Sequence, residues 1–321
     1  MTREIQPLLT IAIPTHNSGK FIGKTLKSIS SQMSEEFRSL VQIVVIDNAS
    51  QDSTLSIVAE HDFTCKLKVI KNPVNMGAHY SHDKCGLEAD GKYIWFLGSQ
   101  DALLPNALEK MIRVCEMERY TNILLNFSVA NELDSSLDEI NHYMIGNDLE
   151  IKDGYEFYRK LGGHALAMSA NVILRENYLS VSENTLVSKN WTLYQRFSDS
   201  TFLKEKRVEY YFISDPVFIL MQESDGWWTT PAVFLNFVAL REIQRTSWKR
   251  NFKIYLFLTY RNGGRALTNS IALGRHAGYK PTFRMTFRLI SLCFFDPRVF
   301  IAVLALYSPR KALNAIQNNL I

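Results

Sequence analysis

The sequence has 321 residues, 46% of them hydrophobic, which is enough for one large domain or two modest ones and excludes a disordered chain. The formal net charge of +4 is unevenly distributed, because the part from Arg241 onward holds 14 Lys and Arg against two acids. Such a basic, aromatic-rich part suggests attraction to an anionic surface, either lipid headgroups or nucleic acid.

The cysteines and the apolar runs set expectations about location. The four cysteines lack the paired spacing of a metal site or a disulfide framework, which favours a reducing cytoplasm. Residues 1–9 lack the apolar core of a secretory signal. The longest apolar run near the end, residues 299–307, is far shorter than the ~20 residues of a membrane-spanning helix. We expect a protein that lies on a membrane without crossing it.

Strand and helix patterns alternate along the first 130 residues. Short apolar runs predict strands at 8–13, 41–46, 67–70, 93–97 and 123–129. Helical periodicity or capping signals predict helices at 21–32, from about 53 to 61, at 78–89 and at 106–118. Continuous apolar strands separated by helices indicate an α/β fold with a parallel sheet covered on both faces.

The pattern is weaker after residue 130. Residues 131–149 predict an irregular loop, and residues 172–174 and 217–221 predict further strands. Beyond Pro231 the sequence is basic and strongly helical, with helices expected at 232–260, 266–276 and 282–295. We expect an α/β domain over residues 1–230 and a helical, basic C-terminal region over residues 231–321.

Polar residues follow the ends of four predicted strands, or the turns just after them, at Thr15, Asp47, Asn75 and Asp101. In open parallel sheets, ligands bind beyond the carboxyl ends of the strands. The pattern therefore predicts that these four residues converge on one site.

Four segments, in this order and spacing, resemble the family-2 glycosyltransferases of the GT-A fold. They are IPTHN at 13–17, VVIDNASQDST at 44–54, NPVNMG at 72–77 and ADGKYIWFLG at 89–98. The resemblance covers about a third of the chain, from residue 8 to residue 117. The asparagine-rich second segment and Leu103-Leu104-Pro105 most resemble bacterial O-antigen enzymes, including those that transfer 3,6-dideoxyhexoses such as abequose. The resemblance implies a mostly parallel GT-A sheet with flanking helices.

The resemblance places a nucleotide sugar against the first three loops. The residues it assigns there are Pro14, Thr15, His16, Asn17, Asp47, Asn75 and Gly77. Asp47 is suited to accept hydrogen bonds from a pyrimidine edge, although a strand-terminal Asp is also a common helix start. His16 stands where the family often has tyrosine, and its ring can stack on the base. The structural alternative is that the loop 14–19, with Gly19, and the loop 72–77, with Gly77, are ordinary turns.

The fourth segment departs from the family pattern. Members usually carry two or three aspartates at this strand end, which bind Mg²⁺ or Mn²⁺ on the donor diphosphate. This chain has Gly98-Ser99-Gln100-Asp101, so Asp101 falls on the last acidic position and becomes the expected metal ligand. One carboxylate is enough for an ion held mainly by phosphates. Ser99 and Gln100 replace the acids that usually contact ribose and donor sugar, and a deoxygenated sugar would present fewer hydroxyls to them.

The catalytic base of the family has no matching acid pair in this chain. An inverting transfer needs a base to take the proton of the acceptor hydroxyl. The region 182–191 resembles the family's base-bearing segment but lacks its Glu-Asp pair, which leaves Glu183 as the nominee, with Asp199 behind it. A solvated loop acid is the alternative for Glu183, and a retaining mechanism stays open.

The resemblance and the basic tail, which begins at Arg241, together imply the partners. We expect a UDP- or CDP-sugar donor and a lipid-linked oligosaccharide acceptor in O-antigen or lipopolysaccharide biosynthesis. Residues 279–311 interleave cations and aromatics, which suits a helix lying at the inner face of a bacterial inner membrane. A packed helix pair with snorkelling arginines is the alternative. We do not expect nucleic acid as a partner.

Two rivals are weighed against this function. A nucleotidyltransferase should carry a Gly-rich, basic phosphate loop after the first strand, and residues 14–20 lack one. A non-catalytic nucleotide-sugar-binding protein on a GT-A scaffold is conceivable, because Ser99 and Gln100 replace two acids.

Overall fold

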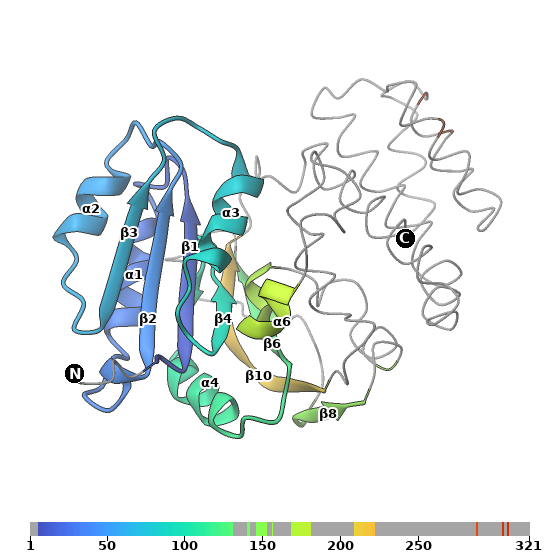
Figure 1. The fold of residues 1–321 in the computed structure, drawn as a ribbon. Coiled ribbons are helices and arrows are strands. Elements are labelled where there is room, and N and C mark those ends of the chain that lie inside the picture. Colours follow the sequence, from blue (N-terminus) through green and yellow to red (C-terminus); the bar gives the residue numbers. More distant parts are fainter. Residues whose placement is uncertain are drawn as a thin grey trace. The chain divides into compact units, whose positions relative to one another are not determined.

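The computed structural model describes residues 6–130, 140–141, 146–152, 156, 168–180, 209–221, 287, 304 and 307. By its contacts the chain divides into two compact units, one of residues 1–157 with 164–222 and the other of residues 158–163 with 223–321. Every labelled helix and strand belongs to the first unit (Figure 1).

Strands and helices alternate over the first 120 residues of this unit, except that the strand at residues 102–103 directly follows the strand at residues 93–96. The strands are β1 (Leu9–Thr15), β2 (Val41–Asp47), β3 (Lys66–Lys71), β4 (Tyr93–Phe96), β5 (Ala102–Leu103), β6 (Asn122–Ala130), β7 (Ile140–Asn141), β8 (Leu149–Ile151), β9 (Asn171–Leu174) and β10 (Tyr210–Met221). The helices are α1 (Ile22–Ser30), α2 (Thr54–Glu60), α3 (Ala78–Leu87), α4 (Ala107–Glu116) and α6 (Arg175–Ser180), with 3-10 turns η1 (Phe37–Ser39) and η3 (Met168–Ala170).

The described strands form one mixed sheet in the order β3-β2-β1-β4-β9-β6-β10-β5, with β7 paired to β6 and β8 paired to β10. The first four strands are parallel to one another, and β6 and β10 are also parallel. Strand β9 runs antiparallel between β4 and β6 and so connects the two parallel groups. The α/β class and the parallel sheet of the first 100 residues are confirmed.

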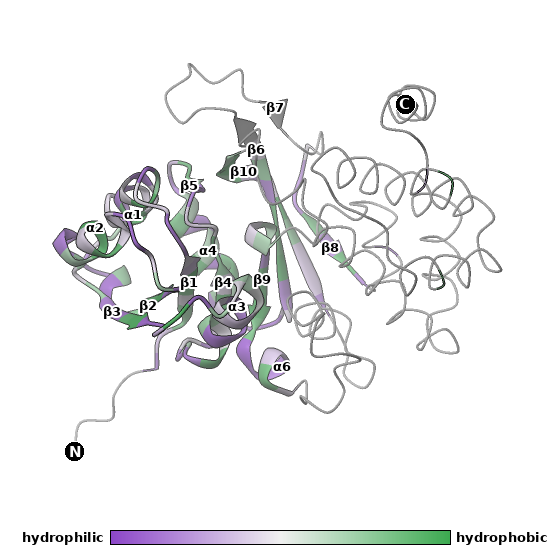
Figure 2. Ribbon diagram, turned by 90° about the horizontal axis from the view of Figure 1, so that it is seen from above, coloured by the Kyte–Doolittle hydropathy of each residue, from purple (hydrophilic) through white to green (hydrophobic). Residues whose placement is uncertain are grey.

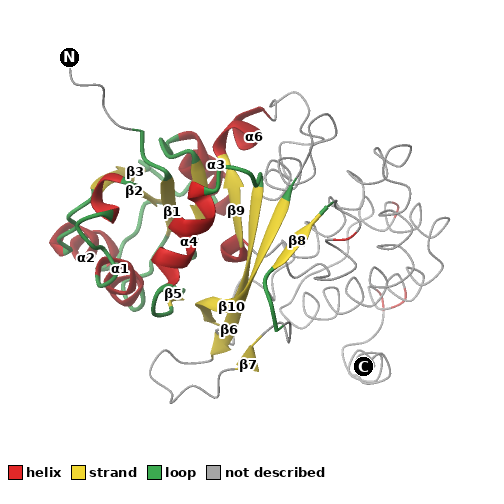
Figure 3. Ribbon diagram, turned by 90° about the horizontal axis from the view of Figure 1, so that it is seen from below, coloured by secondary structure: helices red, strands yellow, loops and turns green. Residues whose placement is uncertain are grey.

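Helices cover both faces of the parallel strands, as the sequence predicted. In two opposite views, α1 and α4 lie on one face and α3 and α6 on the other (Figures 2 and 3). Helix α1 turns Ile22, Leu26 and Ile29 to the core, at the spacing of one helical face. All seven residues of β2 are buried, which explains why this strand reads as a continuous apolar run.

Two predictions for the later part of the chain were incomplete. Within the segment predicted as an irregular loop, residues 140–141 form β7 and pair with β6. The strand predicted at 217–221 begins seven residues earlier, at Tyr210. Its register shifts between Ile213 and Phe218, around Pro216, so the turn signal of Ser-Asp-Pro marks a bulge inside one strand.

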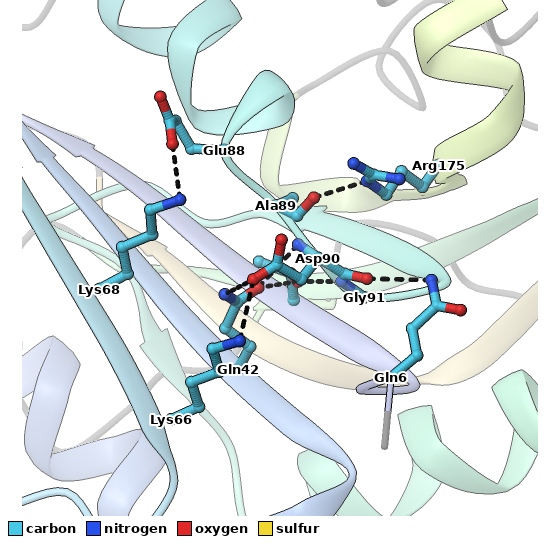
Figure 4. A network of polar contacts seen from close by, with 10 residues as sticks. Gln6, Gln42, Lys66, Lys68, Glu88, Ala89, Asp90, Gly91 and Arg175 are labelled. Carbon is cyan, nitrogen blue, oxygen red and sulfur yellow. Dashed lines mark hydrogen bonds and ion pairs between the residues drawn. The ribbon is translucent and has the colours of Figure 1, made fainter. Parts of the chain in front are cut away.

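A polar network joins the amino ends of the parallel strands, at the edge away from Thr15 and Asp47 (Figure 4). The Gln42 side chain donates to Asp90 Oδ2 at 2.7 Å and accepts from Thr10 Oγ1 at 2.7 Å. Burial raises the pKa of Asp90, but the hydrogen bonds from Lys66 and Gln42 outweigh it and lower that pKa. A Cβ on Gly91 would lie 2.6 Å from the backbone nitrogen of Thr10, so this position requires glycine.

Among the residues that the structure describes, no helix is long and apolar enough to cross a bilayer. Cys65, Cys85 and Cys115 are free thiols. Cys293 lies outside the described residues, and so do the helices predicted beyond Pro231, apart from residue 287.

Candidate functional site

The carboxyl ends of β1 and β2 place Thr15 and Asp47 side by side. The two residues are register partners, and their exposed fractions are 3% and 0%. The backbone nitrogen of Ser50 donates to Asp47 Oδ2 at 3.1 Å. Asp47 Oδ1 and Thr15 Oγ1 have no hydrogen-bond partner within the described part of the chain. Because a buried polar atom without a partner is costly, a ligand that supplies hydrogen bonds here is favoured.

The loops that follow β1 and β2 are tied together in an unusual backbone conformation. Asn17 and Ala49 both have left-handed backbones, with φ of 49° and 60°. The backbone nitrogen of Asn17 donates to Ser50 Oγ at 2.9 Å, and Asn17 Oδ1 accepts from the Gln51 nitrogen at 2.8 Å. For an alanine this conformation costs roughly 1–2 kcal/mol, and such strain is found most often at functional sites.

Asn48 connects this pair of loops to the turn after β3. Its Nδ2 donates to Asn75 Oδ1 at 2.8 Å, and its Oδ1 accepts from the Met76 nitrogen at 2.9 Å. The Asn75 side chain in turn lies 3.1 Å from His16 Nε2. Gly77 has a φ of 86°, a conformation that favours glycine, which explains why glycine occupies this position of the turn.

The segment after β4 lies against α1 and the first loop. Ser99 Oγ is 2.8 Å from Ser18 Oγ, and Thr25 of α1 donates its hydroxyl to the Ser99 carbonyl at 3.0 Å. Gln100 is half-buried, and its side chain makes no hydrogen bond within the described part of the chain. Of the two residues that replace the usual acids, Ser99 is already bonded to Ser18 but its hydroxyl keeps capacity for a further hydrogen bond, and the Gln100 side chain is available to a ligand.

Asp101 is held from the other side of the segment. Its exposed fraction is 5%, Ser169 Oγ donates to its Oδ2 at 2.5 Å, and the Met221 nitrogen donates to its Oδ1 at 3.3 Å. Burial raises the pKa of Asp101 to about 6, although the hydrogen bond from Ser169 acts in the opposite direction. The carboxylate thus joins the segment to η3 and β10.

The Asp101 carboxylate could bind a divalent ion if other ligands of the ion come from outside the protein. Within the described residues, no group of three or more His, Cys, Asp or Glu can hold an ion, and no cation pairs with Asp101. Carboxylate oxygens keep lone pairs beyond the two hydrogen bonds, and a buried carboxylate without a cation gains from one. The residues therefore fit an ion whose remaining ligands are diphosphate oxygens and water.

Direct hydrogen bonds join all four loops that the sequence picked out. The pairs that join them are Asn17 with Ser50, His16 with Asn75, Asn48 with Asn75, and Ser18 with Ser99. Pro14 is half-buried within β1, directly before Thr15. The structure thus gathers at one sheet edge every predicted site residue that it describes.

A comparison with protein families identifies the family of the chain. The glycosyl transferase family 2 domain matches residues 10–170, which is half of the chain. The chain belongs to the family 2 glycosyltransferases.

Curated relatives of this family 2 glycosyltransferase align over about a third of its length. The abequosyltransferase RfbV of Salmonella typhimurium is 31% identical over 103 residues, which are 32% of this chain and 30% of that protein. An uncharacterized glycosyltransferase of Methanocaldococcus jannaschii is 31% identical over 124 residues, or 38% of this chain and 42% of that protein. The matched segment spans 30% to 42% of the length of these two relatives. An abequosyltransferase is thus among the relatives, as the resemblance implied.

Solved structures match nearly the whole chain in fold. S. aureus TarS 1-349 in complex with UDP superposes with a TM-score of 0.61 over 97% of this chain and 90% of that one, at 15% identity. The mannosyltransferase PcManGT of Pyrobaculum calidifontis, in complex with GDP-Man and Mn²⁺, has a TM-score of 0.54 over 98% and 85% of the two chains, also at 15% identity. At these identities the likeness shows the GT-A fold of the family 2 glycosyltransferase.

Two predicted parts of the site fall outside the described residues. Glu183 and Asp199, the nominees for the base, lie in the segment 181–208. Most of the basic tail lies outside as well, although its residues Phe287, Leu304 and Tyr307 are helical and exposed.

The sequence reasoning missed three residues of this family 2 glycosyltransferase site. Asn48 and Asn72 lie inside the segments that resemble the family, so the sequence could have suggested them. Only the fold shows that Asn72 Nδ2 donates to Asn48 Oδ1 at 3.1 Å. Ser169 had no local signal, because it reaches Asp101 across 68 residues of sequence.

Proposed function

We propose that the chain transfers a hexose from a nucleoside-diphosphate sugar to a hydroxyl group of an acceptor. The observation that carries this proposal is the pair of buried, unpartnered atoms at the sheet edge, Asp47 Oδ1 and Thr15 Oγ1. They lie within a set of four hydrogen-bonded loops and offer an acceptor and a hydroxyl to a ligand. Family membership and the nucleotide complexes of proteins with the same fold support the same ligand class.

The donor is proposed to be a UDP- or CDP-sugar. Asp47 accepts an N–H of the nucleobase, and the loop Pro14–Asn17 contacts base and ribose. The turn with Asn75 and Gly77 lies beneath the nucleotide. Ser99 and Gln100 contact the sugar through uncharged hydrogen bonds.

A Mg²⁺ or Mn²⁺ ion is proposed to accompany the donor, with Asp101 as its protein carboxylate. When bound, such an ion supplies charge neutralisation to the leaving diphosphate. The protein's own part is to keep Asp101 in place through Ser169 and Met221.

Glu183 is proposed as the base that takes the proton of the acceptor hydroxyl. An inverting transfer needs that base, whereas a retaining transfer lets leaving-group oxygens assist the acceptor. The anomeric configuration of the product, read by NMR, separates the two. Turnover by a Glu183→Gln variant at the wild-type rate would remove Glu183 from this role.

The acceptor is proposed to be a lipid-linked oligosaccharide at the inner face of a bacterial inner membrane, in O-antigen biosynthesis. The basic tail and its exposed residues Phe287, Leu304 and Tyr307 support a membrane surface. The abequosyltransferase among the relatives supports a 3,6-dideoxyhexose as the sugar. Salt-sensitive binding to anionic liposomes but not to duplex DNA is the expected result.

A second function is a non-catalytic nucleotide-sugar-binding protein on the same scaffold. The specific observation behind it is the replacement of two acids by Ser99 and Gln100. Turnover with any nucleotide sugar excludes it.

The test of the main proposal is a thermal-shift panel of UDP-, CDP-, GDP- and dTDP-sugars, with and without Mn²⁺. We expect UDP- or CDP-sugars to raise the melting temperature. Replacing Asp47 by Asn should weaken that ligand by roughly 10- to 100-fold, because the hydrogen bond to a charged acceptor is lost. Asp62→Asn, an exposed carboxylate outside the four loops, is the matched control. Equal weakening by both variants, or no shift with any nucleotide sugar, would contradict the proposal.

A further inference from the structure

A chain of side-chain amides runs across the site edge and ends on the imidazole of His16. The chain passes through Asn72, Asn48 and Asn75 to His16, and Asn17 reaches the same ring from the other side. The distances to His16 Nε2 are 3.1 Å from the Asn75 amide and 3.3 Å from the Asn17 amide. Which end of each amide faces the ring decides where the ring carries its proton.

The orientation of Asn75 is set by partners that can only donate. The backbone nitrogen of Gly77 donates to Asn75 Oδ1 at 2.9 Å, so this atom is the oxygen of the amide. Asn48 Nδ2 also donates to it, and Asn48 is itself fixed because its Oδ1 accepts from the Met76 nitrogen. The Asn75 atom that faces His16 is therefore the Nδ2 donor.

Asn17 is oriented in the same way by a separate contact. The backbone nitrogen of Gln51 donates to Asn17 Oδ1 at 2.8 Å. The other end of the Asn17 amide, which faces His16 Nε2, is therefore also a donor. Two independent backbone N–H groups thus lead to the same conclusion for the two neighbours of the ring.

Two donors at Nε2 require that this nitrogen presents its lone pair. The ring proton of neutral His16 then resides on Nδ1, because an Nε2–H would be directed at two other N–H groups. Within the described part of the chain, Nδ1 has no hydrogen-bond partner, and the His16 side chain is exposed at the site edge. The ring therefore offers one oriented N–H donor to a ligand.

We propose that Asn17 and Asn75 hold His16 in its Nδ1–H tautomer, and that this N–H donates to a carbonyl oxygen of the nucleobase of the bound nucleoside diphosphate. The ligand part of this inference rests on the proposed function. Uracil complements such a site, because it has an N–H for the acceptor Asp47 Oδ1 and a carbonyl beside it for the donor of His16. Adenine has no carbonyl group. His16 is on this basis a specificity-determining residue.

The first experiment measures the tautomer in the ligand-free full chain. Two-dimensional ¹H–¹⁵N spectra of histidine-labelled protein at a pH of about 9 report which ring nitrogen is protonated, and the His16→Gln variant assigns the signal. We expect a pyrrole-type Nδ1 and a pyridine-type Nε2. Asn75→Asp keeps the acceptor for Gly77 and turns the second atom into an acceptor, so this variant should move the proton to Nε2. A wild-type ring with its proton on Nε2 would overturn the inference.

The second experiment measures nucleotide affinity for two matched variants by calorimetry. An asparagine amide takes about the place of imidazole Nδ1, whereas a glutamine amide takes about the place of Nε2. His16→Asn should therefore bind UDP within about twofold of wild type, and His16→Gln should bind it roughly three- to tenfold more weakly. Binding of ADP should change little in both.

The outcomes separate the two proposals. Equal loss of UDP affinity in both variants, or in neither, would overturn the donor role of His16 while nucleotide binding itself stands. If the wild type binds no nucleotide, the proposed function and the ligand part fail, whereas the tautomer spectrum still decides the role of Asn17 and Asn75.

Discussion

Ser169 offers a direct test of how the segment after β4 is held. Its hydroxyl donates to Asp101 Oδ2 and accepts from the Gly98 nitrogen at 3.0 Å, so a Ser169→Ala substitution removes two hydrogen bonds at once. The substitution leaves the backbone contact of the same residue intact, because the Trp95 indole donates to the Ser169 carbonyl at 2.8 Å. The loss is therefore confined to the hydroxyl.

The expected cost follows from what each partner loses. A hydrogen bond to a charged carboxylate contributes about 1.5–3 kcal/mol, and the one to the partly buried Gly98 N–H about 1 kcal/mol. The variant should lose about 2.5–4 kcal/mol of unfolding free energy. For a unit of this size, that corresponds to a fall in melting temperature of roughly 5–16 °C.

Ser128→Ala is the matched control. Ser128 of β6 is fully buried, and its hydroxyl has no hydrogen-bond partner within the described residues. Removing that hydroxyl should leave stability unchanged or slightly higher, because a buried polar atom without a partner disfavours folding. Thermal unfolding followed by far-UV circular dichroism compares the two variants. If Ser169→Ala unfolds within about 2 °C of Ser128→Ala, the reasoning about the Asp101 segment is wrong.

Three further predictions concern the two ends of β4. Gly91→Ala should cost about 1–3 kcal/mol by thermal unfolding, because its Cβ would meet the Thr10 backbone, whereas Gly146→Ala, with open space around the Cβ, should cost nothing measurable. Asp90→Asn should destabilise the fold at neutral pH, and the difference should vanish as the pH falls below the lowered pKa of Asp90, since that carboxylate stabilises only while ionised. An unchanged difference at low pH in urea titrations would contradict this. Asp101→Asn should abolish the Mn²⁺-dependent part of donor binding in calorimetry, and full retention of it would remove Asp101 as the ion's ligand.

The parallel half of the fold could be predicted from sequence because neighbouring residues in the chain determine each of its strands and turns. Strands β1, β2 and β4 are buried on both faces, so each one appears as an unbroken apolar run, and the loops between them carry turn and capping residues. The antiparallel part carries less of this signal, although β9 was predicted from its apolar run at 172–174. The two-residue strands β5 and β7 are too short to show a period, and β10 is interrupted in sequence by the Pro216 bulge.

The same distinction applies within the site. Asp47 could be selected from its place at a strand end, but nothing in its neighbourhood shows that one carboxylate oxygen lacks a partner. That fact depends on tertiary contacts, as does the contact of Ser169 with Asp101 across 68 residues. Local pattern therefore identifies which loops are candidates for the site, whereas the hydrogen bonding of each polar atom follows from the fold.

The segment around β4 shows why a recognised motif does not by itself assign function. Its first residues, Asp90 and Gly91, join the amino ends of the strands, where they contact Gln42 and Thr10. Its continuation past the other end of β4, up to Asp101, lies at the opposite edge. There Thr15 Oγ1 and Asp47 Oδ1 have no hydrogen-bond partner within the described residues. Four buried strand residues separate the two ends, so one continuous stretch of sequence serves stability at one edge and, in our proposal, ligand binding at the other. The substitution at Gly91 should therefore change the melting temperature without changing donor binding, whereas the one at Asp101 should change donor binding and, because its carboxylate also accepts from Ser169, stability as well.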